Sequence, residues 1–224
     1  KAMTKPLMTP DSKTIENSNL ARFMQRRGFV DYEDLHAWSI NNRTEFWQAI
    51  WNDWQVIAST EPDRVMIKGD DFMASRWFPG AKLNFAENLL RYRDDTPAIV
   101  ALLETGERQE LSYSQLYQSV ARLAAEFRQY GVQPGDRIAG WLPNVPEAVI
   151  AMLACASLGA VWSSCSPEFG TEGAVDRFGQ IEPKLIIACE QYSYNGKTFN
   201  IAKKVTEVTD RVTSIEGILW IADI

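Results

Sequence analysis

From residue 136 onward, short apolar segments rich in β-branched residues alternate with longer segments of helical periodicity. Parallel strands need a crossover between them, so this alternation predicts a doubly wound, mainly parallel α/β sheet with helices on both faces. In such sheets ligands bind beyond the carboxyl ends of the strands. The predicted strands cover residues 137–142, 160–164, 185–189 and 217–222, and the loops after the first three are LPNVPE, SSCSPEFG and EQYSYNGKT.

The sequence before this alternation differs in composition and in the secondary structure that it predicts. Residues 14–92 contain five of the eight Trp and the only His, and helices are predicted over residues 31–40 and 44–54. Four apolar side chains of the second helix share one face and are interpreted as packing anchors: Trp47, Ile50, Trp51 and Trp54. We therefore expect a Trp-rich helical N-terminal segment over residues 1–92 and an α/β domain over residues 93–224.

The α/β domain is expected to begin with a hairpin and a long helix. Residues 97–104 and 108–113 read as two strands around a Thr105–Gly106 turn, and residues 112–131 read as an amphipathic helix. The final apolar segment, GILWIADI, reads as a buried strand at the end of the chain. We expect from it a truncated sheet, whose unfinished edge would pair with the remainder of its own chain or promote self-association.

Charge and cysteine content exclude several classes of partner. The chain of 224 residues has a net charge of −6, which argues against nucleic acid and anionic membranes as partners. No apolar run approaches the roughly 18 residues that a membrane span needs. The three cysteines are widely spaced, without a CxxC pair, which fits free thiols in a reducing cytoplasm. No metal site is predicted.

Classical nucleophile chemistry has little support. Cys165, in SSCSPEFG, would need an activating base, and the only histidine, His36, lies in the helical segment. A Gly-x-Ser-x-Gly elbow is absent, and so is the GxGxxG that an NAD-dependent oxidoreductase would carry after a strand. No catalytic residue is therefore assigned within the chain.

The segment NGKT, residues 195–198, is a candidate phosphate contact. It is predicted to lie just before a helix that starts near residue 200, where backbone N–H groups and Lys197 could hold a phosphate with help from Lys203 and Lys204. The alternative is an exposed turn with solvated lysines. The residues alone leave these two interpretations equally open.

Three segments carry a resemblance to a known family. WFPGAKLNFAENLL resembles the N-terminal segment of the acetyl-CoA synthetase group. The long segment from YGVQPGDRIAGWLP to SSCSPEFG resembles the first core block of the AMP-forming acyl-CoA synthetases, in the adenylate-forming superfamily. Within that group, WSSCSPEFG, DRFGQIEPK and YNGK look like the acetoacetyl-CoA synthetases in particular.

This resemblance implies a ligase that uses ATP, Mg²⁺ and CoA. An acid, here acetoacetate, would form an acyl adenylate with release of diphosphate, and CoA would then capture the acyl group. The family's TSGTTGxPK-type phosphate loop is absent from this sequence, so we expect the chain alone to be inactive. The alternatives are a synthetase for another short acid, such as acetate or propionate, and a non-catalytic module that binds CoA or a nucleotide.

The resemblance also implies a CoA channel beside two loops. Acetyl-CoA synthetases place a glycine-rich loop where this chain has residues 166–170, and two arginines near the CoA phosphates where it has Tyr194 and Lys197. A lysine keeps one positive charge, whereas a tyrosine removes the other and adds a stacking surface. The candidate CoA-binding residues are Ser166, Pro167, Glu168, Phe169, Tyr194, Gly196 and Lys197.

Overall fold

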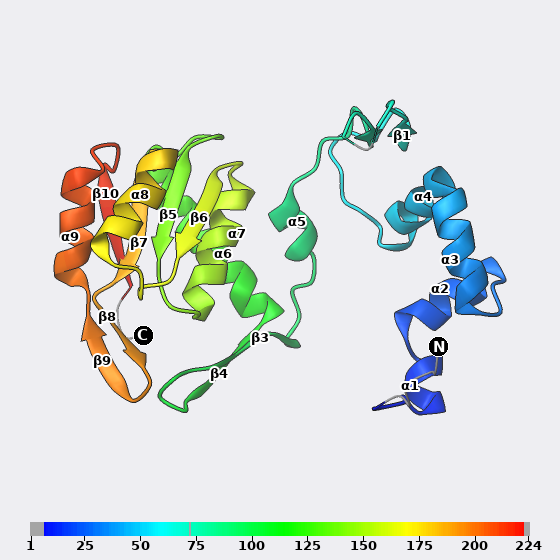
Figure 1. The fold of residues 1–224 in the computed structure, drawn as a ribbon, viewed down its shortest axis with the longest axis horizontal. Coiled ribbons are helices and arrows are strands. Elements are labelled where there is room, and N and C mark those ends of the chain that lie inside the picture. The colour runs from blue at the N-terminus through cyan, green and yellow to red at the C-terminus, as the bar shows by residue number, and fades with distance from the viewer. Residues whose placement is uncertain (1–6, 72, 222–224) are drawn as a thin grey trace. The chain divides into compact units, whose positions relative to one another are not determined.

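A computed structural model describes residues 7–71 and 73–221. The chain divides into two compact units at Lys82/Leu83, whereas the sequence suggested a boundary at 92/93. We call residues 1–82 the N-terminal unit and residues 83–224 the α/β unit, and describe each by itself. Figure 1 labels their helices and strands.

The N-terminal unit is helical. Its core is formed by Phe23, Leu35 and Ala49, which are buried among further aromatic side chains. The two helices predicted here are confirmed, and two shorter helices precede them in a stretch too polar to have indicated a packed helix. The elements are α1 (Ser12–Glu16), α2 (Asn19–Arg27), α3 (Tyr32–Asn41), α4 (Arg43–Asp53) and the short strands β1 (Met66–Ile67) and β2 (Arg76–Trp77).

Tryptophans of α4 pack against the segment that contains β2. Trp51 stacks on Phe78 with a ring-centroid distance of 4.6 Å, and Trp47 meets Trp77 edge to face at 5.8 Å. Aromatic pairs of this geometry add to the free energy gained from burying their area. The predicted packing role is confirmed for these two side chains, although Trp47 remains 41% exposed.

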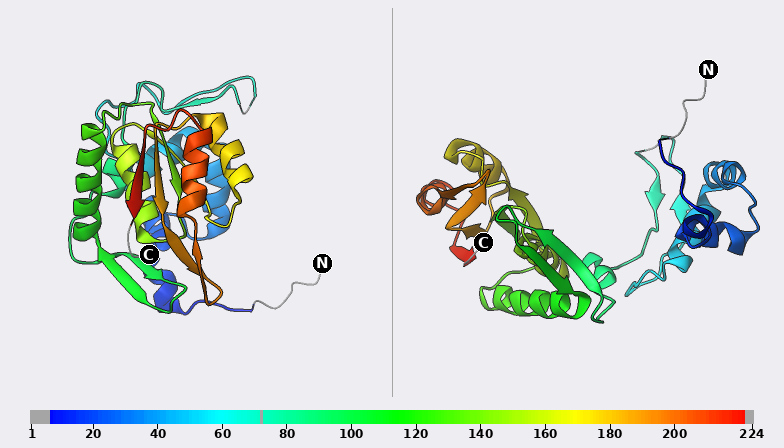
Figure 2. Two further views of the ribbon diagram at one scale, coloured as in Figure 1. Left: turned by 90° about the vertical axis from the view of Figure 1, so that its left-hand side faces the viewer. Right: turned by 90° about the horizontal axis from the view of Figure 1, so that it is seen from below.

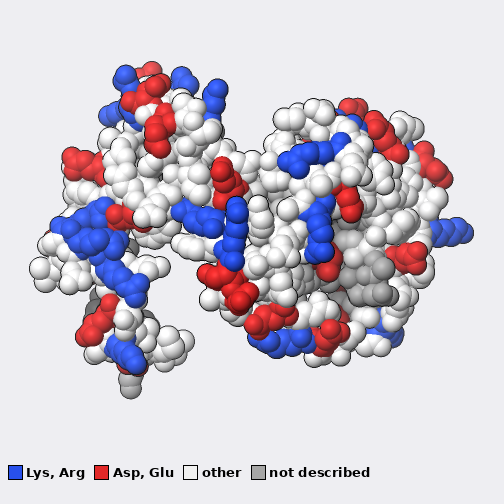
Figure 3. Space-filling view, turned by 180° about the vertical axis from the view of Figure 1, so that it is seen from behind, with Lys and Arg blue, Asp and Glu red and all other residues white. Residues whose placement is uncertain are grey.

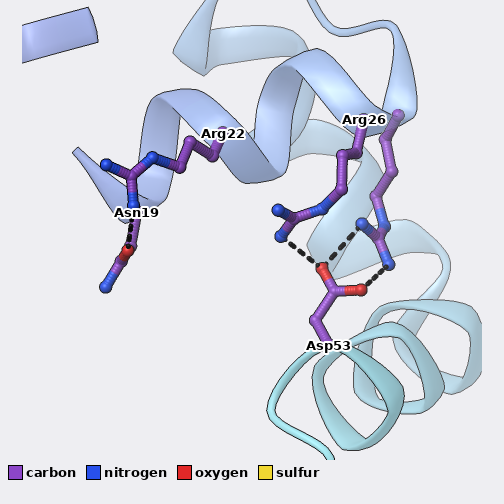
Figure 4. A network of polar contacts seen from close by, with 5 residues as sticks. Asn19, Arg22, Arg26 and Asp53 are labelled. Atoms are coloured by element: carbon purple, nitrogen blue, oxygen red, sulfur yellow. Dashed lines mark hydrogen bonds and ion pairs between the residues drawn. The ribbon is translucent and has the colours of Figure 1, made fainter. Parts of the chain in front are cut away.

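An ion-pair network joins the C-terminal ends of α2 and α4. Asp53 accepts hydrogen bonds from Arg26 at 2.9 Å and from both terminal nitrogens of Arg27 at 2.9 and 3.2 Å (Figure 4). Arg27 also lies over the Phe23 ring, 4.1 Å from its centroid. A carboxylate at a helix C-terminus faces the negative end of the helix dipole. The two guanidinium groups therefore account for the presence of an acid there.

The α/β unit is built around a four-stranded sheet with the order β10-β7-β5-β6, in which every neighbouring pair is parallel. This confirms the predicted fold class. The central strands β5 and β7 are almost wholly buried, as expected of parallel strands covered on both faces. The strands are β5 (Arg137–Trp141), β6 (Val161–Cys165), β7 (Leu185–Cys189) and β10 (Gly217–Ile221); residue 222 of the last predicted strand lies outside the described residues.

Four helices cover the sheet. Figures 1 and 2 show α6 and α7 on one face and α8 and α9 on the other, and each pair is in contact. A capping box between Ser112 and Gln115 starts α6, and Pro146 occupies the first turn of α7. The helices are α6 (Tyr113–Gln129), α7 (Pro146–Ser157), α8 (Thr171–Ile181) and α9 (Ala202–Arg211).

Two antiparallel hairpins lie outside the sheet. The first, β3 (Pro97–Leu102) with β4 (Arg108–Ser112), is the predicted one. The second, β8 (Gln191–Tyr194) with β9 (Lys197–Asn200), occupies EQYSYNGKT, so the prediction of a loop there is wrong. The Asn-Gly pair favours a two-residue turn in which both residues have positive φ, and here φ is +48° for Asn195 and +70° for Gly196.

A short helix, α5 (Phe85–Leu89), opens the α/β unit. Asn84 caps it by accepting a hydrogen bond from the backbone N–H of Glu87 at 3.1 Å. The same side chain donates to the carbonyls of Ala156 and Ser157 at the end of α7, at 2.9 and 3.3 Å. One amide thus satisfies backbone groups at two helix ends.

Candidate functional site at the carboxyl edge of the sheet

The carboxyl ends of β5, β6 and β7 meet at one edge of the parallel sheet. The segment SSCSPEFG begins in the last three residues of β6 and continues as a loop over residues 166–170, and the β8–β9 hairpin follows β7. Ligands bind at this edge in open α/β sheets. The fold therefore brings the two groups of candidate residues to the same side of the molecule.

Two contacts with neighbouring elements hold the SSCSPEFG segment, one from β5 and one from α8. The indole Nε1 of Trp141, the last residue of β5, donates to the Ser166 carbonyl at 3.0 Å, and Pro167 is buried. Phe169 remains 37% exposed, and the Arg177 guanidinium lies 4.3 Å from its ring centroid. The loop thus presents a cation stacked on an aromatic ring, a pairing that sequence reasoning missed because it joins the loop to the second turn of α8.

Cys165, the last residue of β6, is not an activated nucleophile. Burial raises the pKa of the Cys165 thiol to about 11, against the opposing influence of the nearby Arg177 charge. Burial likewise raises the pKa of Cys155 to about 12 and that of Cys189 to about 11. Because the thiolate is the reactive form, buried thiols with raised pKa values are inert at neutral pH.

The β8–β9 hairpin carries an aromatic and a cation side by side at its tip. Tyr194 and Lys197 are paired across the two strands, directly beside the turn, and both are exposed. Two residue pairs further from the tip, the buried Tyr192 stacks on Phe199 with ring centroids 5.3 Å apart. This aromatic pair stiffens the hairpin below the tip.

The charge of Glu168 acts on Tyr192 of the hairpin. Burial raises the pKa of the Tyr192 phenol, and the Glu168 carboxylate raises it further. A carboxylate affects a phenol in this way only at short range in salt solution. Glu168 is therefore a residue of the SSCSPEFG segment whose charge acts on the hairpin.

The structure corrects the interpretation of NGKT as a segment just before a helix. Gly196 lies in the hairpin turn, Lys197 opens β9, and α9 begins only at Ala202. A four-residue strand spans roughly 13 Å, which separates the hairpin tip from the lysines of α9. Lys197 therefore does not share a helix N-terminus with Lys203 and Lys204.

Acidic and basic side chains are interspersed over the part of the α/β unit that Figure 3 shows. On this face the described residues form no extended field of one sign, so anion binding would depend on individual groups. Within residues 7–71 and 73–221, no three His, Cys, Asp or Glu side chains gather as a metal site requires. In the same ranges no helix has the length and apolar character needed to cross a membrane.

Comparison with known families decides the classification. The family model described as AMP-binding enzyme matches residues 85–222, and the model described as acetyl-coenzyme A synthetase N-terminus matches residues 32–89. The chain belongs to the AMP-binding enzyme family. The first match covers the α/β unit almost completely, and the second covers much of the N-terminal unit.

Individual members of the AMP-binding enzyme family agree with this assignment. An acetoacetyl-coenzyme A synthetase of Rhizobium meliloti (strain 1021) is 42% identical over 91% of this chain and 32% of its own length. A malonamoyl-CoA synthetase of Penicillium aethiopicum is 37% identical over 84% of this chain and 27% of its own length. The solved acetoacetyl-CoA synthetase from Streptomyces lividans superposes with a TM-score of 0.89 at 37% identity, over 97% of this chain and 35% of that chain. The chain therefore spans about a third of the length of these relatives.

Proposed function

We propose that this chain is the N-terminal portion of an acetoacetate–CoA ligase and contributes part of its CoA-binding surface. In the first reaction, an acetoacetate carboxylate oxygen attacks the α-phosphorus of ATP, and the bond to diphosphate breaks. In the second, the CoA thiol loses its proton, its sulfur attacks the acyl carbon, and the bond to AMP breaks. Mg²⁺ would neutralise charge on the ATP phosphates.

The pairing of Tyr194 and Lys197 at the hairpin tip is the observation that carries the CoA assignment. CoA presents an adenine ring and phosphate groups close together. An exposed tyrosine can stack on the ring, and an exposed lysine can pair with a phosphate. Both side chains project from the carboxyl edge, where the sheet architecture favours ligands.

The residues of the SSCSPEFG loop would form the other wall of the channel. Phe169, with Arg177 over its ring, adds a second aromatic surface and a second positive charge on that side. In this proposal these residues contribute to the reaction by positioning CoA, and no proton transfer is assigned to them. The cytoplasm, where acid, ATP and CoA occur together, is the proposed location.

Acid-dependent exchange between ATP and diphosphate tests the activity. The full-length protein that contains this sequence is assayed with acetoacetate, acetate, propionate, 3-hydroxybutyrate and malonamate, beside residues 1–224 alone. We expect acetoacetate-dependent exchange by the full-length protein and none by residues 1–224. Malonamate belongs in the panel because a malonamoyl-CoA synthetase is 37% identical to this chain. If exchange depended on another acid, the assigned reaction type would stand and the assignment of acetoacetate as the substrate would be wrong.

Substitutions at the hairpin tip test the CoA assignment. In the full-length protein, Lys197→Met should raise KM for CoA about tenfold, and Tyr194→Ala should raise it several-fold, with the ATP–diphosphate exchange unchanged. Lys203→Met is the matched control, because Lys203 is an exposed lysine on α9, beyond the far end of β9. An unchanged KM for CoA in the Lys197 variant would place CoA elsewhere.

A further inference from the structure

The tips of the two hairpins are joined by one hydrogen bond. The backbone N–H of Asn195, in the β8–β9 turn, donates to the Glu104 carboxylate at 3.2 Å. Figures 1 and 2 show the turn ends of β3–β4 and β8–β9 beside each other. The two residues are 91 positions apart in the sequence, so this contact depends on the tertiary fold.

The geometry of the turn leaves this N–H available. In a two-residue turn the flanking residues, here Tyr194 and Lys197, pair with each other. The N–H of the first turn residue then points out of the ladder and needs an acceptor elsewhere. A carboxylate makes a stronger acceptor than water or a neutral group.

The backbone around Glu104 is held in a closed turn. It lies in the β3–β4 turn, which is closed by hydrogen bonds from the Leu103 N–H to the Glu107 carbonyl and from the Gly106 N–H to the Leu103 carbonyl, both at 2.9 Å. Strand β4 continues directly into α6 through the Ser112 cap. The backbone that carries Glu104 is therefore joined to the body of the α/β unit.

The opposite end of the β8–β9 hairpin is also fixed. The N–H of Ile201, which is 1% exposed, donates to the Glu190 carbonyl at 2.8 Å and closes the base. Between this base and the tip, the aromatic pair of Tyr192 and Phe199 stiffens the strands. A hairpin held at its base alone can swing at its tip, and the Glu104 contact opposes that motion.

We propose that Glu104 is a positioning residue for CoA: by holding the Asn195 N–H, it fixes the hairpin tip that presents Tyr194 and Lys197. This inference rests on the proposed function of the tip. A carboxylate near a site for an anionic ligand would by itself repel the ligand. Positioning and direct repulsion therefore predict opposite effects when the side chain is removed.

Two substitutions in the full-length protein separate these effects. Glu104→Ala removes both the acceptor and the charge, and KM for CoA should rise about three- to tenfold. Glu104→Gln keeps an acceptor oxygen and removes the charge, so KM for CoA should stay at or below that of the parent. Glu107→Ala is the control, since Glu107 lies in the same turn and its carboxylate accepts from Gln109 instead. In all three, the ATP–diphosphate exchange should be unchanged.

Each result bears on the inference. A KM for CoA in Glu104→Ala that does not rise above the parent value would overturn the positioning role, and a fall below it would mean that Glu104 only repels the ligand. An equal rise in Glu104→Ala and Glu104→Gln would also overturn it, because the amide retains the acceptor. If Lys197→Met raises KM but Glu104→Ala does not, the CoA assignment stands and this inference falls. If Lys197→Met has no effect, the CoA assignment falls and this inference with it.

Discussion

The indole of Trp162 lies directly over Gly140 on the neighbouring strand of the parallel sheet. A Cβ atom at Gly140 would come within 2.4 Å of two ring carbons of Trp162 and 3.3 Å of the Ser164 Cβ. The glycine and the tryptophan lie on adjacent strands, β5 and β6, where Gly140 pairs with Ser164. The absence of a side chain at this position of β5 is what makes room for the largest side chain of β6.

Gly140→Ala should therefore lower the free energy of unfolding by about 1–3 kcal/mol, because the ring must shift within a packed layer. Urea denaturation measures this. Gly179→Ala is the matched control: Gly179 lies in α8, and a Cβ added there would meet no atom within 4 Å, so alanine should be neutral or slightly stabilising. Equal stability of the two variants would contradict the proposed clash.

Asn84 serves two helix ends, and its substitutions should reveal both roles. Asn84→Ala should cost about 1–2 kcal/mol through loss of the α5 cap and of the donors to Ala156 and Ser157. Asn84→Asp keeps the cap but places a negative charge against the carbonyls that end α7. If Asn84 acted only as a cap, the Asn84→Asp variant should be as stable as the parent. The contacts with α7 predict instead that this variant is clearly less stable. Thermal melts of the three proteins distinguish these outcomes.

The Asp53 network makes the N-terminal unit sensitive to acid. Hydrogen bonds from Arg27, then from Arg26, together with their charges, hold the pKa of the Asp53 carboxyl below its usual range. A group whose pKa is lowered on folding stabilises the fold above its unfolded pKa, near 4, and loses this contribution as the pH falls through the folded value. Asp53→Asn should lower the melting temperature at pH 7, and the difference from the parent should shrink as the pH falls below about 4.

Circular dichroism melts between about pH 2.5 and pH 7 provide the measurement for Asp53, a range that spans the expected titration. Glu16→Gln, at an exposed acid on α1, is the control and should leave the melting temperature nearly unchanged at every pH. A constant difference between Asp53→Asn and the parent over the whole range would show that the ion pairs do not depend on Asp53 ionisation.

The three cysteines should resist thiol reagents in the folded protein. Burial raises the pKa values of Cys165 and Cys189 to about 11 and that of Cys155 to about 12. At pH 8 we expect almost no reaction with Ellman's reagent before unfolding, and three thiols per chain after unfolding in guanidinium chloride. Rapid native reaction of one thiol would contradict its burial. In the full-length protein, Cys165→Ser should retain activity.

The sheet could be predicted from sequence because its signals are local. Apolar strands, helical periodicity, the Pro-Gly punctuation and the Pro146 start of α7 all lie within a few residues of the elements they specify. The β8–β9 hairpin was missed because its strands are short and mostly polar. The Asn-Gly turn and the alternating Tyr192, Tyr194 and Phe199 were the signals that could have found it.

The candidate site was only partly predictable. The resemblance to AMP-forming synthetases pointed to Tyr194 and Lys197, but nothing near them in the sequence indicates Glu104 or Arg177. Glu104 contacts Asn195, and Arg177 contacts Phe169, only because the tertiary fold brings these residues together. Likewise, the need for glycine at position 140 could not be predicted, because it arises only when β6 pairs with β5 and places Trp162 over Gly140.

The order of strands in the sheet, β10-β7-β5-β6, has a consequence for synthesis of the chain. Once β5 and β6 have paired, each later strand joins the edge that the preceding addition left open: β7 docks on β5, and β10 docks on β7. Among the described strands, none has to be inserted between two that are already paired. The sheet can therefore grow outward in one direction as the polypeptide leaves the ribosome, with each helix covering the new strand soon after it emerges.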